Sequence, residues 1–182
     1  MGTHRTTFVI GLLLTAGVGL RAAVVPRYSL EELAHSSALI VHATVRGSWV
    51  AWDERGLYLW THYRLEPLET IKGVAAGQVV VSEPGGTLDG VTMLVSDVVQ
   101  FHQGEEVVVF LYRNGLGYWR VRGYGQGKFT LVEAKDGVKK LHTNLDALQI
   151  VETGAAAADG AEALNGWTLG RLRGQLRLAG GR

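Results

Sequence analysis

The chain has 182 residues, and its 18 lysines and arginines nearly balance its 17 aspartates and glutamates, which leaves a net charge of +1 at pH 7. Such a balance provides no field to hold a nucleic acid or attract an acidic substrate, so a nucleic-acid partner is not expected. The absence of cysteine excludes disulfides, thiolate nucleophiles and cysteine-bound metal sites. With 47% hydrophobic and 19% charged residues, the chain should fold as one domain.

Residues 1–23 are typical of a signal peptide. An apolar run, FVIGLLLTAGVGL, occupies residues 8–20 and is followed by Arg-Ala-Ala. As a helix this run would be about 20 Å long, shorter than the roughly 30 Å hydrocarbon core of a bilayer. We therefore predict cleavage near Ala22 or Ala23, export to a periplasm or to the outside of the cell, and no membrane span in the mature chain. An uncleaved anchor is the alternative.

The mature chain should begin with a short helix and a long hairpin. Ser29 and Glu32 form a capping box at the start of SLEELAHSS. The run SALIVHATVRGSWVAW is rich in β-branched and aromatic residues and predicts a strand with a bulge or bend at Gly47. After turn residues 53–56, the alternation in LYLWTHYRLEPLETI predicts a second strand, with Tyr58, Trp60, His62 and Arg64 on one side.

More extended segments follow along the chain. They are QVVVSEP, ended by Pro84-Gly85-Gly86; VTMLVSDVVQF; EEVVVFLYR and LGYWRVRGY, joined at Asn114-Gly115; and KFTLVEAKDGVKKLH, which turns at Asp136-Gly137. Turns about every eight to twelve residues, without a long helix between them, predict an antiparallel barrel or sandwich.

The last part of the chain changes in composition. Residues 153–166 are rich in glycine and alanine and predict a flexible linker, with a poorly anchored helix as the alternative. In residues 167–182, Leu169, Leu172 and Leu176 recur at helical spacing. We expect this C-terminal helix to pack its leucines on the β domain, residues 24–152, while its arginines stay hydrated. Binding of this arginine- and leucine-rich segment to an anionic membrane surface or to a partner's groove is the alternative.

The order of these segments resembles a known module. A short helix, SALIVHATVRG, a second strand ending in ETIKG, QVVVSEPGG and FHQGEEVVVFLYR resemble the netrin-like module over roughly residues 29–132. That module is an OB-type barrel of the tissue inhibitors of metalloproteinases, netrins and complement components. The fold class predicted is therefore all-β: an antiparallel OB-like, netrin-like barrel of five to seven strands, with a short N-terminal helix and a C-terminal helix.

The resemblance also carries a functional implication. It would make the chain an inhibitor of an exported protein such as a secreted metalloprotease, but those inhibitors chelate zinc through an N-terminal cysteine that this chain lacks. The same segments are similar to a group of short bacterial exported proteins of unassigned function. That second resemblance implies no activity.

No residue pattern in the chain is typical of catalysis. The six histidines have no metal-ligand spacing, and no nucleophile, base and orienting group stand in motif order. Three glycines and Lys128 in GYGQGKF resemble a phosphate-binding loop, but a strand follows where such loops need a helix, so a tight turn or bulge is favoured. We therefore expect no enzyme, no metal and no cofactor. A hydrolase assembled from dispersed residues, for example around His42, His62 and His102, is the alternative.

Aromatic residues suggest a contact surface instead. In OB-type barrels exposed aromatics stack on ligands, although large aromatics more often pack in cores or cross-strand pairs. The residues predicted to form the surface are Trp49, Trp52, Trp60 and Trp119, with Glu83, Pro84, Gly85 and Gly86 as a rim loop. The function predicted is an exported, non-catalytic binding or scaffold module. Its partner would be a protein, with peptide or glycan ranked above nucleic acid, and a structural envelope component is a further alternative.

Overall fold

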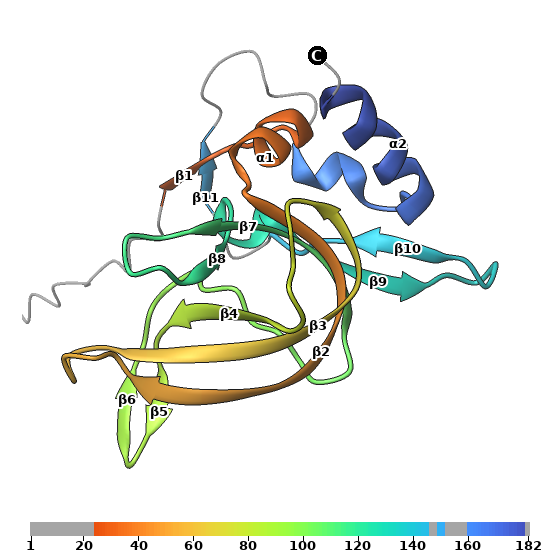
Figure 1. The fold of residues 1–182 in the computed structure, drawn as a ribbon. Helices are drawn as coiled ribbons and strands as arrows, with labels where there is room; N and C mark the ends of the chain where they lie inside the picture. The colour runs from red at the N-terminus through yellow and green to blue at the C-terminus, as the bar shows by residue number, and fades with distance from the viewer. Residues whose placement is uncertain (1–23, 146–148, 152–159, 181–182) are drawn as a thin grey trace, which may run out of the picture.

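The structure is a computed structural model that describes residues 24–145, 149–151 and 160–180 (Figure 1). The predicted signal peptide, residues 1–23, lies outside the described residues. Within them the chain is mostly β with two α-helices, so the predicted β class with a helix near each end is confirmed.

The helices are α1 (Leu30–Ser36) and α2 (Leu169–Gly180), and short 3-10 helices occupy Tyr124–Gly127 and Ala161–Leu164. The strands are β1 (Val24–Pro26), β2 (Leu39–Trp52), β3 (Leu59–Lys72), β4 (Val79–Pro84), β5 (Gly86–Leu88), β6 (Val91–Met93), β7 (Glu106–Arg113), β8 (Trp119–Val121), β9 (Lys128–Glu133), β10 (Lys139–His142) and β11 (Gln149–Val151).

One seven-stranded sheet organises the molecule. Its order is β10-β9-β7-β2-β3-β4-β8, and β8 also pairs with β7, so following the pairs from β7 through β2, β3, β4 and β8 leads back to β7. All these pairs are antiparallel except β4 with β8, where Val81 lies opposite Trp119. The prediction of antiparallel pairing throughout is wrong there. A closed circuit of five strands cannot alternate direction at every step, so one pair must be parallel.

Bulges bend the long hairpin of β2 and β3. Their register shifts three times, the last shift lying between Val45 and Gly47, where the sequence predicted a bulge or bend. Each bulge adds a residue to one strand and increases its local twist. The two strands therefore curve around the body of the sheet, as Figure 1 shows.

Two cores lie on opposite sides of the sheet. In β7, Val107, Val109 and Leu111 enter the first core, whereas Val108 and Phe110 enter the second. This explains the unbroken apolar run VVVFL, because a strand that is buried on both faces does not alternate with polar residues. The first core is closed by residues of β2, β3 and β4, and the second by the helices, β9 and β10.

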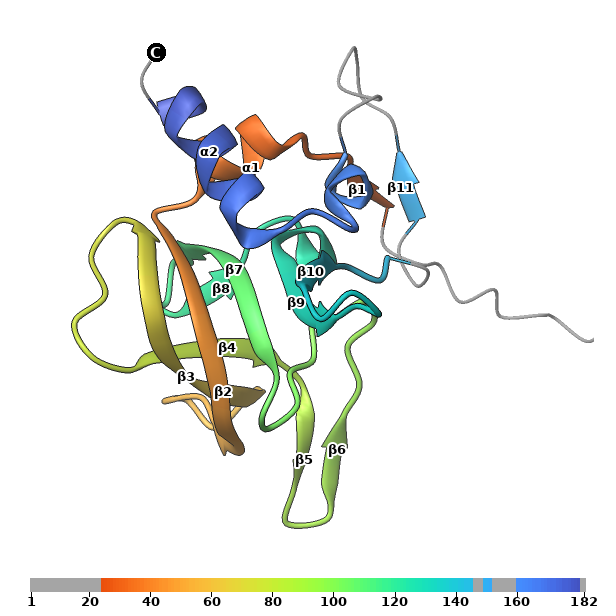
Figure 2. The ribbon, with the colours of Figure 1, turned by 90° about the vertical axis from the view of Figure 1, so that its right-hand side faces the viewer.

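The helices cover the second core together (Figure 2). The capping box of Ser29 and Glu32 begins α1 as predicted. In α2, Leu172 is fully buried and Leu169 and Leu176 pack beside it, so the predicted leucine face is confirmed. Residues 153–159 of the predicted linker lie outside the described residues. Residues 160–166 belong to the packed body, because Ala161 and Leu164 are buried in the second core.

The segment VTMLVSDVVQF does not form the long strand that its composition suggested. Only Val91–Met93 is a strand, β6, and it pairs with β5 in a separate hairpin that projects away from the helices (Figure 2). Asp97 has a φ of 61°, a left-handed conformation that breaks an extended run. Val99 and Phe101 then enter the first core.

Candidate functional site

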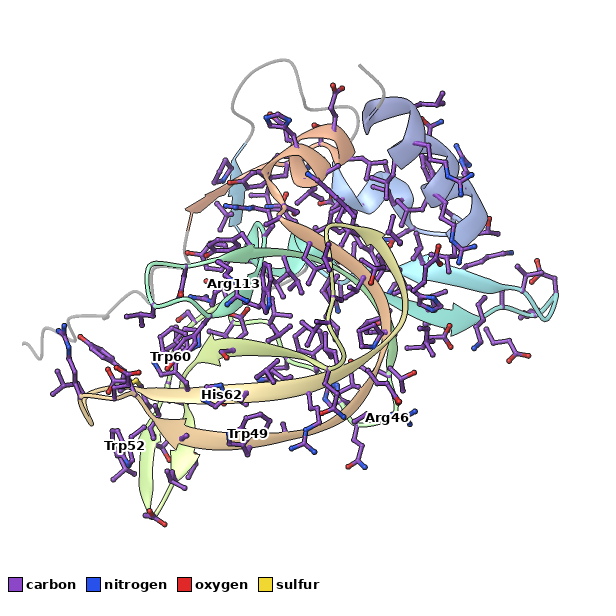
Figure 3. All side chains as sticks on the ribbon, in the orientation of Figure 1. Arg46, Trp49, Trp52, Trp60, His62 and Arg113 are labelled. Atoms are coloured by element: carbon purple, nitrogen blue, oxygen red, sulfur yellow. The ribbon has the colours of Figure 1, made fainter. Side chains whose placement is uncertain are left out.

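A row of polar and aromatic side chains crosses three strands on the outward side of the sheet. Trp49 of β2 lies opposite His62 of β3, and His62 lies opposite Ser82 of β4. Their chain neighbours Tyr63 and Val81 point into the first core. Because side chains alternate along a strand, the row occupies the other face of the sheet. Figure 3 shows Trp49 and His62 on neighbouring strands in the middle of this face.

Trp49 is the exposed member of the row. Its ring stacks on that of His62, with centroids 5.1 Å apart and planes 25° apart, and the Arg64 guanidinium carbon lies 5.5 Å from the indole centroid. The side chain is nevertheless 40% exposed. The next outward positions on β2 are the small residues Gly47 and Ala51, and a Cβ added at Gly47 would meet nothing within 4 Å. The indole therefore stands without bulky neighbours along its own strand.

Two further aromatic rings border the row. Tyr118 packs edge-on against His62 and Trp60, with centroid distances of 5.8 and 5.0 Å. Trp60 is only 7% exposed, and the Arg120 guanidinium carbon lies 5.6 Å from its ring centroid. Trp60 lies two residues before His62, on the same side of β3, and is covered by its neighbours. We call Trp49, Trp60, His62, Arg64 and Tyr118 the aromatic face.

His62 also contacts a serine hydroxyl. Its Nδ1 lies 2.7 Å from Ser82 Oγ, and burial lowers the pKa of His62 below its usual value, which favours the neutral ring. A serine and a neutral histidine in contact are two parts of a hydrolytic site. However, Ser82 is 2% exposed, and among the described residues no carboxylate hydrogen-bonds to His62. The contact therefore satisfies a buried hydroxyl and presents no nucleophile to a substrate.

Glu83 was predicted to lie on an exposed rim, and the structure buries it instead. It is 2% exposed, and its carboxylate accepts hydrogen bonds from Val121 N at 3.0 Å and from Arg120 Nε at 3.0 Å and Nη2 at 2.8 Å. Burial raises the pKa of Glu83, while Arg120 and the Val121 amide act in the opposite direction. Glu83 therefore joins β4 to β8.

The rest of the predicted rim loop is also part of the body. Gly85 is buried and donates to Leu59 O at 2.8 Å, while its carbonyl accepts from Thr61 Oγ1 at 2.8 Å. A Cβ on Gly86 would approach Thr61 and Val50 to within 3.0 Å. Pro84 is half-buried opposite Trp60. These residues pack against the hairpin and do not form a rim.

The four predicted tryptophans do not form one surface. Trp52 is 39% exposed but lies three residues after Trp49 and so points to the opposite side of β2. Trp119 packs against the first core, with the Arg113 guanidinium carbon 4.3 Å from its ring centroid. Only Trp49 combines exposure with the outward row. The predicted surface left out His62 and Arg64. The alternation in LYLWTHYR had placed both on the same side as Trp60, so the sequence did contain a signal for them.

A groove lies apart from the aromatic face, between α1, α2 and the end of β3. This groove has a volume of about 960 Å³ and an apolar lining that includes Ile71 and Leu176. Arg173 of α2 pairs with Glu69 of β3, and Lys72 Nζ donates to Ala34 O at 2.6 Å. Three of its charged groups, Glu69, Lys72 and Arg173, are thus already engaged within the protein.

Two other histidines contact different glutamates. His42 contacts Glu106 at 2.8 Å and His102 contacts Glu105 at 3.2 Å. Within the part of the chain that the structure describes, no three His, Asp or Glu side chains are grouped so as to hold a metal ion. Over the same residues, no helix has the length and apolar character needed to cross a bilayer.

Comparisons with models of protein families, with curated proteins and with solved structures found no match to this chain.

Proposed function

We propose that the protein is a non-catalytic binding module that recognises its ligand with the aromatic face. One observation carries this proposal: the exposed indole of Trp49 lies on His62 and beside Arg64 in the middle of a sheet. Burying an exposed indole against a ligand is favourable, and tryptophan and arginine are enriched among the residues that dominate binding energy. The stacked His62 ring and the Arg64 side chain hold the indole in place, so little side-chain freedom is lost on binding.

Within the mostly β class, we propose that the fold is an OB-like barrel. The circuit β7-β2-β3-β4-β8, with five strands and one parallel pair, supports it. In OB-type barrels ligands bind on the second and third strands and beside the loops after the first and fourth strands. Taken in chain order, β3 and β4 are the second and third strands of this circuit, and Tyr118 lies in the loop between the fourth and the fifth. The aromatic face would therefore occupy the ligand-binding region of such a barrel.

Export is part of the same proposal. The apolar run of residues 8–20, followed by Arg-Ala-Ala, supports cleavage near Ala22 or Ala23 and work in a periplasm or outside the cell. Mass measurement of the mature N-terminus tests this step. A mature chain that begins at Met1 would contradict it.

The test of the binding role compares two tryptophans. Trp49 and Trp52 lie on the same strand with nearly equal exposure, 40% and 39%, but on opposite faces. Immobilised chains of residues 24–182 would be screened on peptide and oligosaccharide arrays as wild type, Trp49→Ala and Trp52→Ala. We expect the wild type and Trp52→Ala to retain the same ligands and Trp49→Ala to lose them. Equal loss in both variants, or no loss in Trp49→Ala, would reject the aromatic face as the binding surface.

A further inference from the structure

The charges around the aromatic face differ in whether they are neutralised. Arg46 pairs with Glu66, and Arg120 pairs with the buried Glu83. Arg64 is exposed and lies against the Trp49 ring, and among the described residues it makes no ion pair with a carboxylate. Beside the exposed indole there is therefore one cation that is free to receive an anionic group.

This arrangement limits the ligand to a single negative charge. A nucleic-acid strand or a sulfated polymer needs several cations along its path, each neutralising one anionic group. Here Arg46 and Arg120 are already paired with carboxylates, and the whole chain has a net charge of only +1. A polyanion would find one cationic partner, and its other anionic groups would keep their counterions and add nothing to binding.

The shape of the platform limits the ligand further. The indole has small neighbours at Gly47 and Ala51 on its own strand, and it stacks on His62. A flat ring with an apolar face, such as the carbon–hydrogen face of a pyranose, can cover it without meeting a side chain on either side along β2. A peptide added along a strand edge would bind through backbone groups in the plane of the sheet, and would not need this outward indole.

We propose that Trp49 is the stacking platform for one pyranose ring of a uronic-acid-bearing oligosaccharide, and that Arg64 receives the carboxylate of that ring. This inference rests on the proposed binding role of the aromatic face and adds the ligand class to it. The indole supplies contact with the ring, and the guanidinium, a planar donor matched to carboxylate geometry, supplies selection for the acid.

The experiment uses residues 24–182 and an array of immobilised oligosaccharides that includes uronate-bearing chains, their methyl esters, neutral chains and sulfated chains. We expect at least one uronate-bearing chain to be retained more strongly than its methyl ester, which has the same ring without the charge. Titration calorimetry with a tetramer that carries one uronate residue, and with the methyl ester of that tetramer, then measures the affinities. Trp49→Ala should weaken both by about fivefold or more, since stacking on one aromatic ring is worth at least about that factor.

Arg64→Gln separates charge from stacking. It should lower the affinity for the acid to that of the ester, by about five- to tenfold, and leave the ester unchanged. Trp52→Ala serves as the matched control and should bind as the wild type does. Trp49→Phe, which keeps an aromatic ring, should bind between the wild type and Trp49→Ala, so that loss of the ring can be told from loss of the fold.

The possible failures are distinguishable. Retention of peptides but not saccharides, with loss in Trp49→Ala, would overturn the uronate inference and leave the binding role intact. Equal retention of acid and ester, or a preference for sulfated chains, would also overturn the inference. Ligands that bind equally well to Trp49→Ala would reject both proposals.

Discussion

At the scale of single residues, Glu83 has a structural role that its place before Pro-Gly-Gly did not suggest. The pairing of β4 with β8 has one residue pair in register, Val81 with Trp119. Beyond that pair, the Glu83 carboxylate accepts the Val121 amide and binds Arg120, so a side chain takes the place of backbone hydrogen bonds. The connection that completes the five-strand circuit therefore depends on one buried carboxylate.

Removal of this carboxylate should destabilise the protein strongly. Glu83→Ala leaves the Arg120 guanidinium and the Val121 amide without their partner, and breaking a buried ion pair costs about 3–5 kcal/mol. Urea unfolding at pH 7 measures this change. Glu133→Ala, at an exposed position of β9, is the control and should change stability by less than about 0.5 kcal/mol.

A double-mutant cycle tests the mechanism of that loss. If the cost comes from stranding Arg120, then Glu83→Ala combined with Arg120→Ala should cost less than the sum of the two single variants. Additive losses would contradict the assigned coupling between the two side chains.

His62, in the aromatic face, should make the stability of the protein depend on pH. Burial lowers the pKa of His62 below 6.5, so the native state binds a proton at this ring less readily than the unfolded chain does. As the pH falls through about 6.5, the unfolded chain takes up the proton first, and stability is lost. Between pH 7 and pH 5 the wild type should therefore lose more stability than His62→Gln does. Urea unfolding at several pH values measures the difference, and an identical pH profile for the two proteins would contradict the prediction.

At the scale of elements, one extra residue decides which tryptophan belongs to the site. Before the bulge, Ile40, His42 and Thr44 point to the outward side of β2, whereas after it the odd-numbered positions do so. Without the bulge between Val45 and Gly47, Trp52 would share a face with His62 and Trp49 would point inward. The sequence predicted a bulge or bend at Gly47 but did not give its effect on the alternation. The prediction that Trp49 and Trp52 share one surface was wrong for this reason.

Other elements were predictable because their signals are local. The capping box at Ser29, the Asn114-Gly115 turn and the Asp136-Gly137 turn need only a few neighbouring residues, and each lies where it was expected. The burial of Glu83 could not be predicted in this way, because its partner Arg120 is 37 residues away along the chain. The same holds for Tyr118, which reaches the aromatic face only when β8 pairs with β4.

The leucine face of α2 provides a test at the same scale. Leu172 is fully buried in the second core, whereas Leu178 on the same helix is 65% exposed. Leu172→Ala should therefore cost about 2–5 kcal/mol of unfolding free energy, and Leu178→Ala less than about 0.5 kcal/mol. Urea unfolding of the two variants measures this contrast. Similar costs for both would mean that α2 does not pack in the observed orientation.

At the scale of the whole molecule, β7 joins the two cores. Alternate residues of this strand enter the first and the second core, and its edges pair with β2, β8 and β9. If one core lost its packing, β7 would be displaced, and the other core would then lose its packing as well. The molecule should therefore behave as one cooperative unit although its apolar residues form two clusters.

This coupling predicts a single unfolding transition. Far-ultraviolet circular dichroism, which follows the backbone, and tryptophan fluorescence should give the same urea midpoint in the wild type. Val109→Ala lies in the first core and Val108→Ala in the second, and both residues are fully buried. Each substitution should lower both midpoints together, because truncating a buried aliphatic side chain leaves a cavity on one side of a strand that both cores require. If Val108→Ala shifted only one of the two signals, the cores would unfold independently, and β7 would not couple the helical cover to the sheet that supports the aromatic face.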